Sequence, residues 1–433
     1  MIISPTRLAA LILLTGFVLS FYRFFPTYSA DLMATWLAGV FLNAGRPDQV
    51  YPAVSDFFLM YPPTDWRSYM ADTYNYNGPI FPFVYPPLWA KLAAPFAETN
   101  FWRITVVALT INAALQMATV WLALRATRTT LNPALFVAIA VVVLLMTHIG
   151  TVPLRQNQPQ VLVSFLLVLA IERTRARSPI IAGAALALAA AIKLYPALFA
   201  LFWLFGRERR AFASFVVFGA ALGLTSLLWA GWPLHAAFLD QIRLISNSVL
   251  VTSISFSIDG TIAQLFFADA LQWVPALEPA TPNRPDPGWY AMARPGAWRM
   301  ASNIALLAAI ALLSWGFHRA DRATQAALLW PLALTTVALL SPITWAYYYV
   351  PTICFAPVLI ERLGLRLGSG FLVVAFVPIL ERMVPIYRVT RDWPGWPPFL
   401  YQIIGVAALT LLAIGFVIAL VRALNTGETA AKP

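Results

Sequence analysis

Between Ile180 and Phe205 the chain reads IIAGAALALAAAIKLYPALFALFWLF, and the fold class can be judged from these residues. Apolar side chains follow one another without the polar positions of a surface helix, and the single charged residue is Lys193. Such runs are typical of a hydrocarbon environment, in which about 20 apolar residues cross the bilayer and fewer suffice for a helix buried among others. We interpret this stretch as two short membrane helices joined at Lys193.

The rest of the chain has the same character. Of its 433 residues, 60% are hydrophobic and 11% are charged, and the mean hydropathy is +0.74. Because soluble globular proteins are about 45–50% apolar and about 25% charged, this composition excludes a soluble enzyme and a disordered chain. The only cysteine, Cys354, excludes a disulfide framework and a Cys-based metal cluster. The net charge of +11 is scattered over short loops, so we expect no nucleic-acid partner.

Apolar blocks of membrane-spanning length recur along the chain, separated by short charged or Pro- and Trp-rich stretches. The first block ends in Phe21-Tyr22-Arg23-Phe24-Phe25 without a small-residue cleavage site, which favours an uncleaved anchor over a signal peptide. The sequence thus predicts an all-α polytopic membrane protein, a bundle of about 12 transmembrane helices, at residues 8–25, 103–124, 132–150, 160–172, 179–192, 194–206, 211–230, 302–317, 326–341, 345–360, 370–384 and 400–421.

Charge predicts the orientation of these helices. With the amino terminus inside, the cytoplasmic connections hold 15 of the 29 basic residues but only five of the 18 acidic ones. Since basic residues accumulate on cytoplasmic loops, we expect both termini in the cytoplasm of a bacterial cell, with the protein in the inner membrane. Two large loops, 26–102 and 231–301, then lie on the extracytoplasmic side, and loops of that length usually carry function.

Asp31 is the first candidate for chemistry. It follows the first predicted span among apolar and aromatic neighbours, where a partly desolvated carboxylate can act as a general base on an acceptor hydroxyl. The alternative is a solvated loop acid, or a helix N-cap for a segment over residues 32–43.

A polar turn, Arg155-Gln156-Asn157-Gln158-Pro159-Gln160, lies between the third and fourth predicted spans. It places one cation and four amides on a short length of backbone, which suits a phosphate or a sugar because arginine binds phosphate through two hydrogen bonds. A hydrated hairpin turn is the alternative.

Lys193 interrupts an apolar stretch in Lys193-Leu-Tyr195-Pro196. A lysine at the edge of the hydrocarbon is costly unless it reaches the interface or meets an anion, and a lipid phosphate would be such an anion. Simple extension of its side chain to the interface explains it as well.

Aromatic residues gather near the start of the tenth predicted span, in Ser341-Pro342-Ile-Thr344-Trp345-Ala-Tyr347-Tyr348-Tyr349. Such clusters usually form an interfacial belt, and they also stack on the faces of sugars. Tyr85-Pro86-Pro87 in the first large loop is by default a rigid turn.

Several motifs are missing from the sequence. It contains no Walker A sequence, no Gly-rich dinucleotide fingerprint and no Asp-x-Asp pair, and its histidines, His148, His235 and His318, are far apart in the predicted topology. We therefore expect no cofactor and no metal ion, and an activated group that arrives already attached to a lipid.

The order of these motifs resembles glycosyltransferase family 87 of the GT-C superfamily. An early Asp, a Tyr-Pro-Pro turn, a Gln/Asn-rich turn, Ile-Lys-x-x-Pro and Ser-Pro-Ile-Thr-Trp follow one another over approximately residues 20–360. Members of this family, such as the mycobacterial phosphatidylinositol mannoside mannosyltransferases, are polytopic and use polyprenyl-phosphate sugars. The resemblance implies a GT-C-type helical bundle, with a catalytic transmembrane module at 1–360 and C-terminal helices with a short cytoplasmic tail at 361–433.

The resemblance also implies roles for single residues. Asp31 matches the catalytic base, and Lys193 matches the lysine that meets the donor phosphate, with Arg155 as a second cation at that phosphate. Ser257, in Ser257-Ile-Asp259-Gly260, matches a position that often reads Asn-x-Ser. The substrate-binding residues expected on this basis are Tyr85, Gln156, Asn157, Tyr195, Ser257, Asp259, Trp345, Tyr347 and Tyr348.

Two positions depart from the family pattern. Arg155 stands where glycine is common, and Ala346-Tyr347-Tyr348 follows Trp345 where the family usually continues with Asp/His-His. The acceptor of the familiar members is therefore not carried over to this chain.

The expected function is transfer of a hexose, mannose in particular, from a polyprenyl-phosphate donor to a lipid or glycan acceptor on the extracytoplasmic face. The family implies inversion in one displacement, without a metal ion and without a covalent intermediate. Three other functions compete with this one: a flippase or transporter of lipid-linked glycans, a glycan polymerase or ligase, and a non-catalytic scaffold. The sequence shows no internal repeat of the transporter kind, and its large loops contain little histidine.

Overall fold

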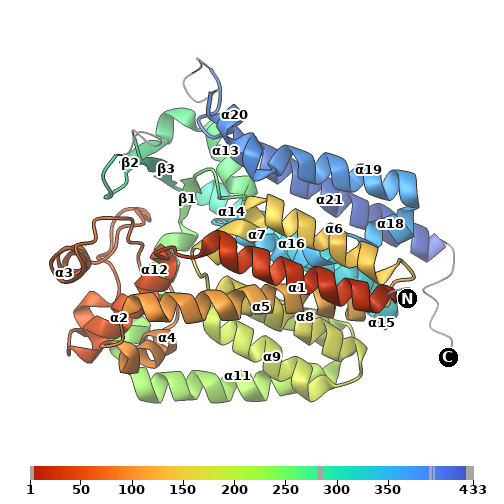
Figure 1. The fold of residues 1–433 in the computed structure, drawn as a ribbon, viewed down its shortest axis with the longest axis horizontal. Coiled ribbons are helices and arrows are strands. Elements are labelled where there is room, and N and C mark those ends of the chain that lie inside the picture. The colour runs from red at the N-terminus through yellow and green to blue at the C-terminus, as the bar shows by residue number, and fades with distance from the viewer. Residues whose placement is uncertain (1–3, 281–285, 390–392, 394, 426–433) are drawn as a thin grey trace.

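The fold is a bundle of helices with a layer of shorter elements at one end. The computed structural model describes residues 4–280, 286–389, 393 and 395–425, so the tail at 426–433, expected to be cytoplasmic, lies outside the described residues. Figure 1 shows the long helices side by side along the long axis of the molecule. The amino-terminal end of α1 (Pro5–Phe24) lies at the end of the bundle opposite the added layer.

Six helices within the described ranges are long and apolar enough to cross a membrane by length and composition. The helix Arg322–Leu340 contains a π-helical segment, η5 (Gln325–Leu329), between α15 (Arg322–Thr324) and α16 (Trp330–Leu340). The six are α1, α5 (Phe101–Thr127), α11 (Arg209–Ala230), α14 (Gly296–Arg319), Arg322–Leu340 and α21 (Leu400–Asn425).

The other expected spans coincide with shorter helical segments. A helix of 14 residues is about 21 Å long, less than the ~30 Å hydrocarbon core, so the expected number of full crossings is not reached by length alone. These segments are α6 (Pro133–Met146), α8 (Gln160–Arg175), α9 (Pro179–Ile192), η3 (Tyr195–Phe199) with α10 (Ala200–Phe205), η6 (Ala346–Tyr349) with α17 (Val350–Phe355) and α18 (Val358–Leu363), and α19 (Leu365–Phe376) with η7 (Val377–Ile379).

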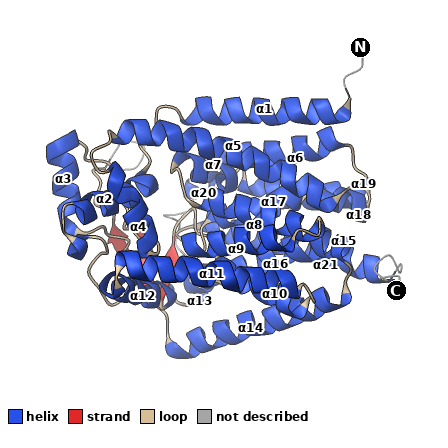
Figure 2. Ribbon diagram, turned by 90° about the horizontal axis from the view of Figure 1, so that it is seen from below, coloured by secondary structure: helices blue, strands red, loops and turns tan. Residues whose placement is uncertain are grey.

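The largest core lies inside the bundle. The Phe317 ring stacks on Phe202 with centroids 4.9 Å apart and meets Trp330 edge-on at 4.9 Å, which ties α14, α10 and α16 together. By contrast, the outer faces of α11 and α14 leave Val217 and Leu312 exposed. Apolar side chains facing outward from a bundle are stable in lipid but not in water, so these helices define the membrane-facing surface. Figure 2 shows α1 and α14 on opposite sides of the bundle.

The first large loop folds into helices with a core of its own. Trp36, Trp66 and Phe101 are fully or almost fully buried in this core, where Trp36 and Phe101 lie 5.1 Å apart between ring centroids. Gly39 allows the loop's main helix to approach the backbone of Ala93, since a Cβ there would lie 2.6 Å from the Ala93 carbonyl carbon. The elements are α2 (Ala30–Asn43), η1 (Pro47–Gln49), α3 (Thr64–Tyr74), α4 (Pro87–Ala93) and η2 (Ala94–Phe96).

The second large loop contains a small sheet that the all-α expectation missed. Its strands pair antiparallel in the order β1-β3-β2, with Val249 opposite Met292 and Val274 opposite Trp289. All four residues of β1 are buried, so the alternation by which a strand is recognised in a sequence is absent. The elements are α12 (Trp232–Ser246), β1 (Ser248–Val251), α13 (Ile258–Phe266), η4 (Ala268–Ala270), β2 (Gln272–Pro275) and β3 (Gly288–Ala293).

The C-terminal helices pack against earlier parts of the chain. α21 contacts α16 and α13, and Gln264 donates to the side-chain oxygen of Gln402 at 3.0 Å. Two short helices, η8 (Glu381–Met383) and α20 (Val384–Arg388), lie between α19 and α21 in the chain. The segments on the two sides of residue 360 therefore share one core.

Candidate active site

Asp31 lies in the first turn of α2, where that helix meets the bundle. The helix begins at Ala30 with Ser29 as its N-cap, so Asp31 is not the cap. The Ala30 N–H donates to Oε1 of Gln156 at 3.0 Å, and the Leu32 N–H donates to the Gln156 carbonyl at 3.3 Å. The polar turn thus satisfies N–H groups that a helix N-terminus leaves open, and it fixes the position of Asp31.

The same turn continues with two buried amides. Asn157 has a φ of 46°, a left-handed conformation that asparagine tolerates, and its side chain donates to Ser29 Oγ at 2.8 Å. Gln158 follows and is almost fully buried; its Oε1 accepts from the Tyr85 hydroxyl at 2.9 Å, and its side chain is also hydrogen-bonded to Asp31. The turn between predicted spans three and four is therefore an ordered part of the site.

Lys193 lies directly after the last residue of α9, in an extended conformation. Its Nζ is 4.7 Å from the ring centroid of Tyr348, 5.2 Å from that of Tyr347 and 5.5 Å from that of Tyr85. Ammonium groups at these distances are attracted by the ring faces. Nζ also donates to the Tyr348 hydroxyl at 3.5 Å.

The Asp31 and Lys193 charges interact without forming a direct ion pair within the described chain. Burial raises the pKa of Asp31 to about 6, while the hydrogen bond from Gln158 and the nearby Lys193 cation lower it. The carboxylate is therefore mostly ionised at pH 7 and becomes neutral in mildly acidic solution. We call Asp31, Tyr85, Gln158, Lys193, Tyr347 and Tyr348 the Asp31–Lys193 cluster.

Tyr195 and Trp345 extend this cluster on two sides. The Tyr195 ring lies 4.8 Å from that of Tyr348, and its hydroxyl accepts from Gln160 at 2.7 Å. Trp345 is nearly parallel to Tyr347, at 16° and 6.2 Å between centroids. The aromatic residues expected to bind substrate therefore form one continuous surface around the Lys193 ammonium.

Arg155 has other neighbours. Its guanidinium is 4.0 Å from Glu381, which also contacts Arg23 at 2.6 Å and lies 3.7 Å from His148. The structure thus gives Arg155 a carboxylate partner outside the Asp31–Lys193 cluster, although its backbone carbonyl still accepts from Ser29 next to Asp31.

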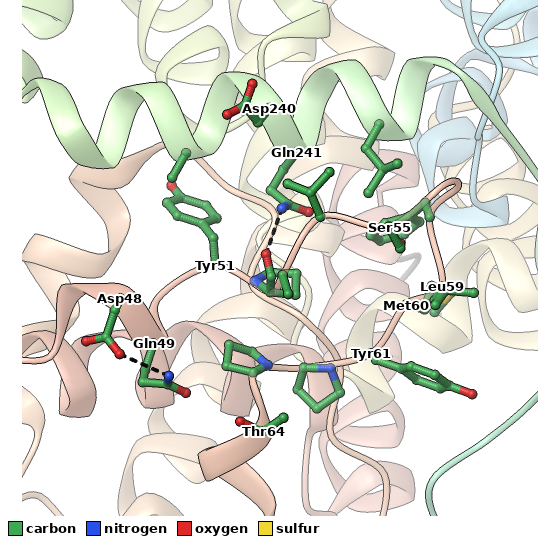
Figure 3. A pocket seen from close by; sticks show the side chains of 18 of the residues that line it. Asp48, Gln49, Tyr51, Ser55, Leu59, Met60, Tyr61, Thr64, Asp240 and Gln241 are labelled. Atoms are coloured by element: carbon green, nitrogen blue, oxygen red, sulfur yellow. Dashed lines mark hydrogen bonds between the residues drawn. The ribbon is translucent and has the colours of Figure 1, made fainter.

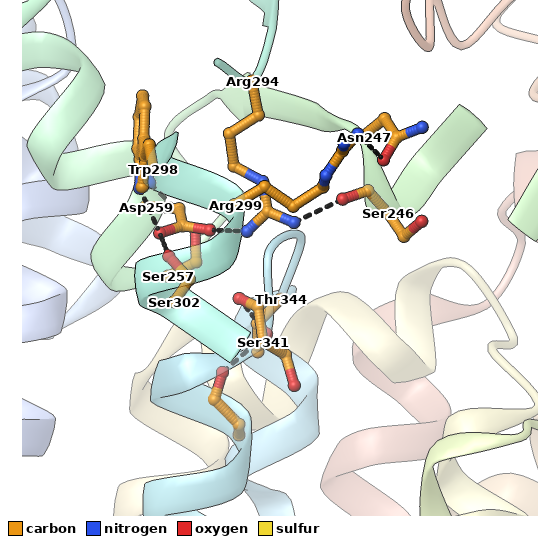
Figure 4. A network of polar contacts seen from close by, with 12 residues as sticks. Ser246, Asn247, Ser257, Asp259, Arg294, Trp298, Arg299, Ser302, Ser341 and Thr344 are labelled. Atoms are coloured by element: carbon orange, nitrogen blue, oxygen red, sulfur yellow. Dashed lines mark hydrogen bonds and ion pairs between the residues drawn. The ribbon is translucent and has the colours of Figure 1, made fainter. Parts of the chain in front are cut away.

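Ser257 and Asp259 lie in a separate network of the second loop (Figure 4). The Ser257 hydroxyl accepts from the Gly260 N–H at 3.1 Å and caps α13. Asp259 accepts from Arg294 at 2.5 Å, from Trp298 at 2.9 Å and from Ser302 at 3.0 Å. These contacts join α13 to α14. Both oxygens of the Asp259 carboxylate accept hydrogen bonds within this network.

The 341–349 segment is hydrogen-bonded to Phe256, two residues before α13. Phe256 N–H donates to the Thr344 carbonyl at 2.6 Å, and the Tyr349 hydroxyl donates to the Phe256 carbonyl at 2.6 Å. These bonds fix the base of the aromatic segment that contacts Lys193.

Gln158 and Gln160 were not among the residues predicted for the site, although both belong to the polar turn. The turn itself was the available signal, since it carries four amides. Within the ranges that the structure describes, no three His, Cys, Asp or Glu side chains gather as metal ligands would.

Six helices of membrane length in the described chain indicate a multi-pass membrane protein. An added layer lies at one end of its bundle, and the Asp31–Lys193 cluster lies where the first helix of that layer meets the bundle. The family model of glycosyltransferase family 87 matches residues 83–342, which is more than half of the chain. The protein belongs to glycosyltransferase family 87 and is a membrane glycosyltransferase. The matched range contains the polar turn and Lys193, whereas Asp31 precedes it and Trp345 follows it.

Among solved structures, the chain is similar to ArnT from Cupriavidus metallidurans bound to undecaprenyl phosphate. The identity is 13%, the alignment covers 97% of this chain and 77% of that chain, and the TM-score is 0.37. No match is found among curated proteins.

Proposed function

We propose that the protein transfers a hexose, mannose in particular, from a polyprenyl-phosphate donor to a hydroxyl group of a lipid or glycan acceptor. The observation that carries this proposal is the Asp31–Lys193 cluster: a carboxylate and an ammonium, 162 positions apart in the numbering, share one partly buried aromatic site. A base and a cation are the two groups that a displacement at a lipid-linked phosphate sugar requires.

Asp31 is the general base in this mechanism. It accepts the proton of the acceptor hydroxyl as the oxygen attacks the anomeric carbon, and the bond from that carbon to the donor phosphate oxygen breaks on the opposite face. A pKa of about 6 suits this role, because the carboxylate is available at neutral pH and is more basic than a fully solvated aspartate. One displacement inverts the anomeric configuration and needs no covalent intermediate.

Lys193 stabilises the leaving phosphate. The leaving group gains negative charge as the bond breaks, and a cation held in place beforehand lowers the energy of that state. Burial among the three tyrosine rings lowers the pKa of Lys193 to about 7, and the nearby Asp31 carboxylate raises it, so the lysine retains cationic character at neutral pH. The mechanism therefore draws its charge stabilisation from the protein, with neither a metal ion nor a cofactor.

Arg155 is proposed as a second contact of the donor phosphate. Glu381 holds it at 4.0 Å together with Arg23, so the group of two arginines and one carboxylate keeps an excess of positive charge that an anionic ligand can use. Exchange of Glu381 for phosphate is the step that this role requires.

The remaining predicted residues have proposed roles that follow their contacts. Tyr85, Tyr195, Trp345, Tyr347 and Tyr348 offer rings and hydroxyls to the transferred sugar around Lys193. Gln156 and Asn157 are proposed to bind substrate indirectly, through the position they give to α2. Ser257 and Asp259 are proposed to support the substrate site, Ser257 by capping α13 and Asp259 by joining α13 to α14.

The orientation proposed for the bundle puts the added layer outside the cell. α2, α3, α12 and the sheet lie at the end of the bundle opposite the start of α1 (Figure 1). With basic residues gathered on the other connections, this arrangement supports cytoplasmic termini and an extracytoplasmic site in a bacterial inner membrane. A catalytic module at 1–360 and accessory helices at 361–433 are proposed as a division of roles within the shared core.

Sugar transfer by the full chain in nanodiscs tests this function. The donor is radiolabelled polyprenyl-phosphate mannose, with the glucose and arabinose donors in parallel, and native lipid extract is the acceptor. We expect labelled product with and without EDTA, and Arg155→Gln to weaken inhibition by polyprenyl phosphate. Absence of product with every donor contradicts the proposal and directs the next test to flipping of lipid-linked glycans in liposomes.

A further inference from the structure

A cavity of about 550 Å³ opens in the added layer, between the 47–64 segment of the first large loop and α12 (Figure 3). Its size falls within the range of about 300–1,000 Å³ that is usual for small-molecule sites. Pro47, Pro52, Pro62 and Pro63 make up much of the loop wall, and proline fixes backbone geometry before a ligand binds. We call this space the loop pocket.

The loop pocket is lined mostly by apolar side chains, with a few polar groups and two carboxylates among them. Asp48 and Asp240 line it together with amide and hydroxyl side chains, and its described lining includes no Lys, Arg or His. Arg46 and Arg243 contact these carboxylates from outside the lining, at 3.9 Å and 3.3 Å. Because each of these two carboxylates is already paired with an arginine, the pocket suits a neutral ligand better than an ionic one.

Two amide oxygens in the lining lack hydrogen-bond partners. Gln241 is only 1% exposed; its Nε2 donates to the Pro52 carbonyl at 2.9 Å, while its Oε1 has no partner among the described residues. Gln49 repeats the pattern, with Nε2 donating to Asp48 at 3.0 Å and Oε1 unpartnered. A buried acceptor without a donor is costly, and hydroxyl groups of a ligand are suitable donors.

The loop pocket and the Asp31–Lys193 cluster share a wall. Tyr51 lines the pocket, and its hydroxyl donates to the Tyr85 carbonyl at 2.7 Å. The Tyr85 ring in turn faces Lys193 at 5.5 Å, and its hydroxyl is bonded to Gln158. Two tyrosines in contact, Tyr51 and Tyr85, therefore connect the pocket to the proposed reaction centre.

We propose that the loop pocket binds the acceptor through a neutral, polyhydroxylated headgroup remote from the hydroxyl that is glycosylated. This inference rests on the proposed function, since it names the acceptor side of the same site. The Gln241 and Gln49 carbonyl oxygens accept hydrogen bonds from the headgroup hydroxyls, and Tyr61 and Met60 offer apolar surface to the ring faces. The separation of acceptor pocket and phosphate-binding cation keeps the two substrates apart until transfer.

The test measures glycan binding without the donor. The full chain in nanodiscs is applied to an array of neutral, amino and acidic oligosaccharides, with Gln241→Met and Gln49→Met as the variants. Methionine keeps the length of the side chain but removes the amide. Gln272→Met, at an exposed position of strand β2 outside the pocket, is the matched control.

We expect the wild type to bind neutral oligosaccharides, each pocket variant to lose at least about tenfold in apparent affinity, and Gln272→Met to bind as the wild type does. Gln49→Met keeps the test valid if Gln241→Met fails to fold, since Gln49 is only partly buried.

Equal binding by wild type and folded pocket variants overturns the proposal, as does binding of acidic glycans alone or of no glycan at all. Its failure is distinguishable from failure of the proposed function. If the pocket variants transfer sugar normally and with an unchanged acceptor KM, the acceptor role of the pocket is contradicted and the transferase function stands. If the protein binds glycans but transfers sugar from no donor, the transferase function is contradicted instead.

Discussion

At the scale of single residues, the site depends on a carboxylate that the fold keeps in an unfavourable environment. Asp31 is partly buried, and its ionised form is supported by one amide and one nearby ammonium rather than by an ion pair. A raised pKa in the folded state means that ionisation of Asp31 at pH 7 opposes folding. Residues that reduce stability in this way are often retained for function.

The first prediction concerns pH. Because the pKa of Asp31 is raised to about 6 and the base must be ionised, kcat/KM should fall about tenfold per pH unit below about 6. The free energy of unfolding changes in the opposite direction. Above the folded-state pKa of Asp31, the ionised carboxylate destabilises the fold, and this cost disappears as the pH falls toward the pKa of Asp31 in the unfolded chain. Asp31→Asn should therefore melt at a higher temperature than the wild type at pH 7.5, by an amount that shrinks at pH 5.

Both quantities are measurable on one preparation in detergent, by initial rates and by thermal unfolding from pH 5 to 8. A flat kcat/KM profile over that range would exclude Asp31 as the base. Asp72→Asn, at an exposed position of α3, serves as the control and should change neither quantity.

The second prediction concerns Lys193. Lys193→Met keeps an unbranched side chain among the three tyrosine rings but removes the charge, so we expect kcat/KM for the donor to fall by about 10²–10³-fold. Inhibition by polyprenyl phosphate should weaken in parallel, because the product carries the anion that Lys193 meets. Lys91→Met on α4 removes a charge outside the cluster and should retain wild-type rates. Unchanged product inhibition in Lys193→Met would place the phosphate elsewhere.

The sequence identified single residues whose chemical type is unusual for their surroundings. A lone lysine in an apolar run and an acid beside a predicted span are visible without a fold, and the structure brings Asp31 and Lys193 together. Gln158 was not singled out, because an amide beside other amides in a turn has no distinguishing feature in the sequence. Its role depends on contacts with Asp31 and Tyr85 that only the folded chain creates.

At the scale of elements, α2 is positioned by a turn 126 positions later in the numbering. The turn supplies acceptors to Ala30 and Leu32 and a donor to Ser29, so the first helix of the added layer is fixed to the bundle at the residue next to Asp31. The sequence showed the turn but not its partner, because hydrogen bonds between distant segments leave no local pattern.

The third prediction tests whether Asp259 stabilises the fold or binds the substrate. Asp259→Asn leaves the buried Arg294 guanidinium without its carboxylate, which should lower the stability of the fold by about 3–5 kcal/mol. We expect the remaining folded protein to keep wild-type KM values, since Asp259 is fully engaged within the network.

Thermal unfolding and substrate kinetics of the same preparation check this prediction. Asp65→Asn breaks an exposed ion pair with Arg46, 2.6 Å in length, and is the matched control; its melting temperature should stay within error of the wild type. A normal melting temperature with a raised KM in Asp259→Asn would instead assign Asp259 to substrate binding.

At the scale of the whole molecule, the apolar periodicity of the sequence located the helices well. A helical segment lies at each expected span, because long apolar runs bounded by Pro, Gly and charge are strong signals. The small sheet was not anticipated, and of the helices in the added layer only a segment over residues 32–43 was considered in advance. β1 is short and all four of its residues are buried, so it lacks the alternation on which the prediction of a strand depends.

The fourth prediction concerns orientation. In a Cys354→Ala background, Asp72→Cys on α3 should react with a membrane-impermeant maleimide on intact cells, because α3 belongs to the layer placed outside. Arg366→Cys, exposed at the start of α19, should react only after permeabilisation. The reverse labelling pattern would invert the proposed topology and put the site in the cytoplasm.

The most direct test of the central claim measures donor binding and sugar transfer side by side for the wild type and Asp31→Asn. Full-length protein in nanodiscs at pH 7.5 is given radiolabelled polyprenyl-phosphate mannose, and bound donor and lipid-linked product are counted separately. If Asp31 is the base, Asp31→Asn binds donor as tightly as the wild type and transfers sugar at least about 100-fold more slowly. Transfer at the wild-type rate by folded Asp31→Asn would contradict the account.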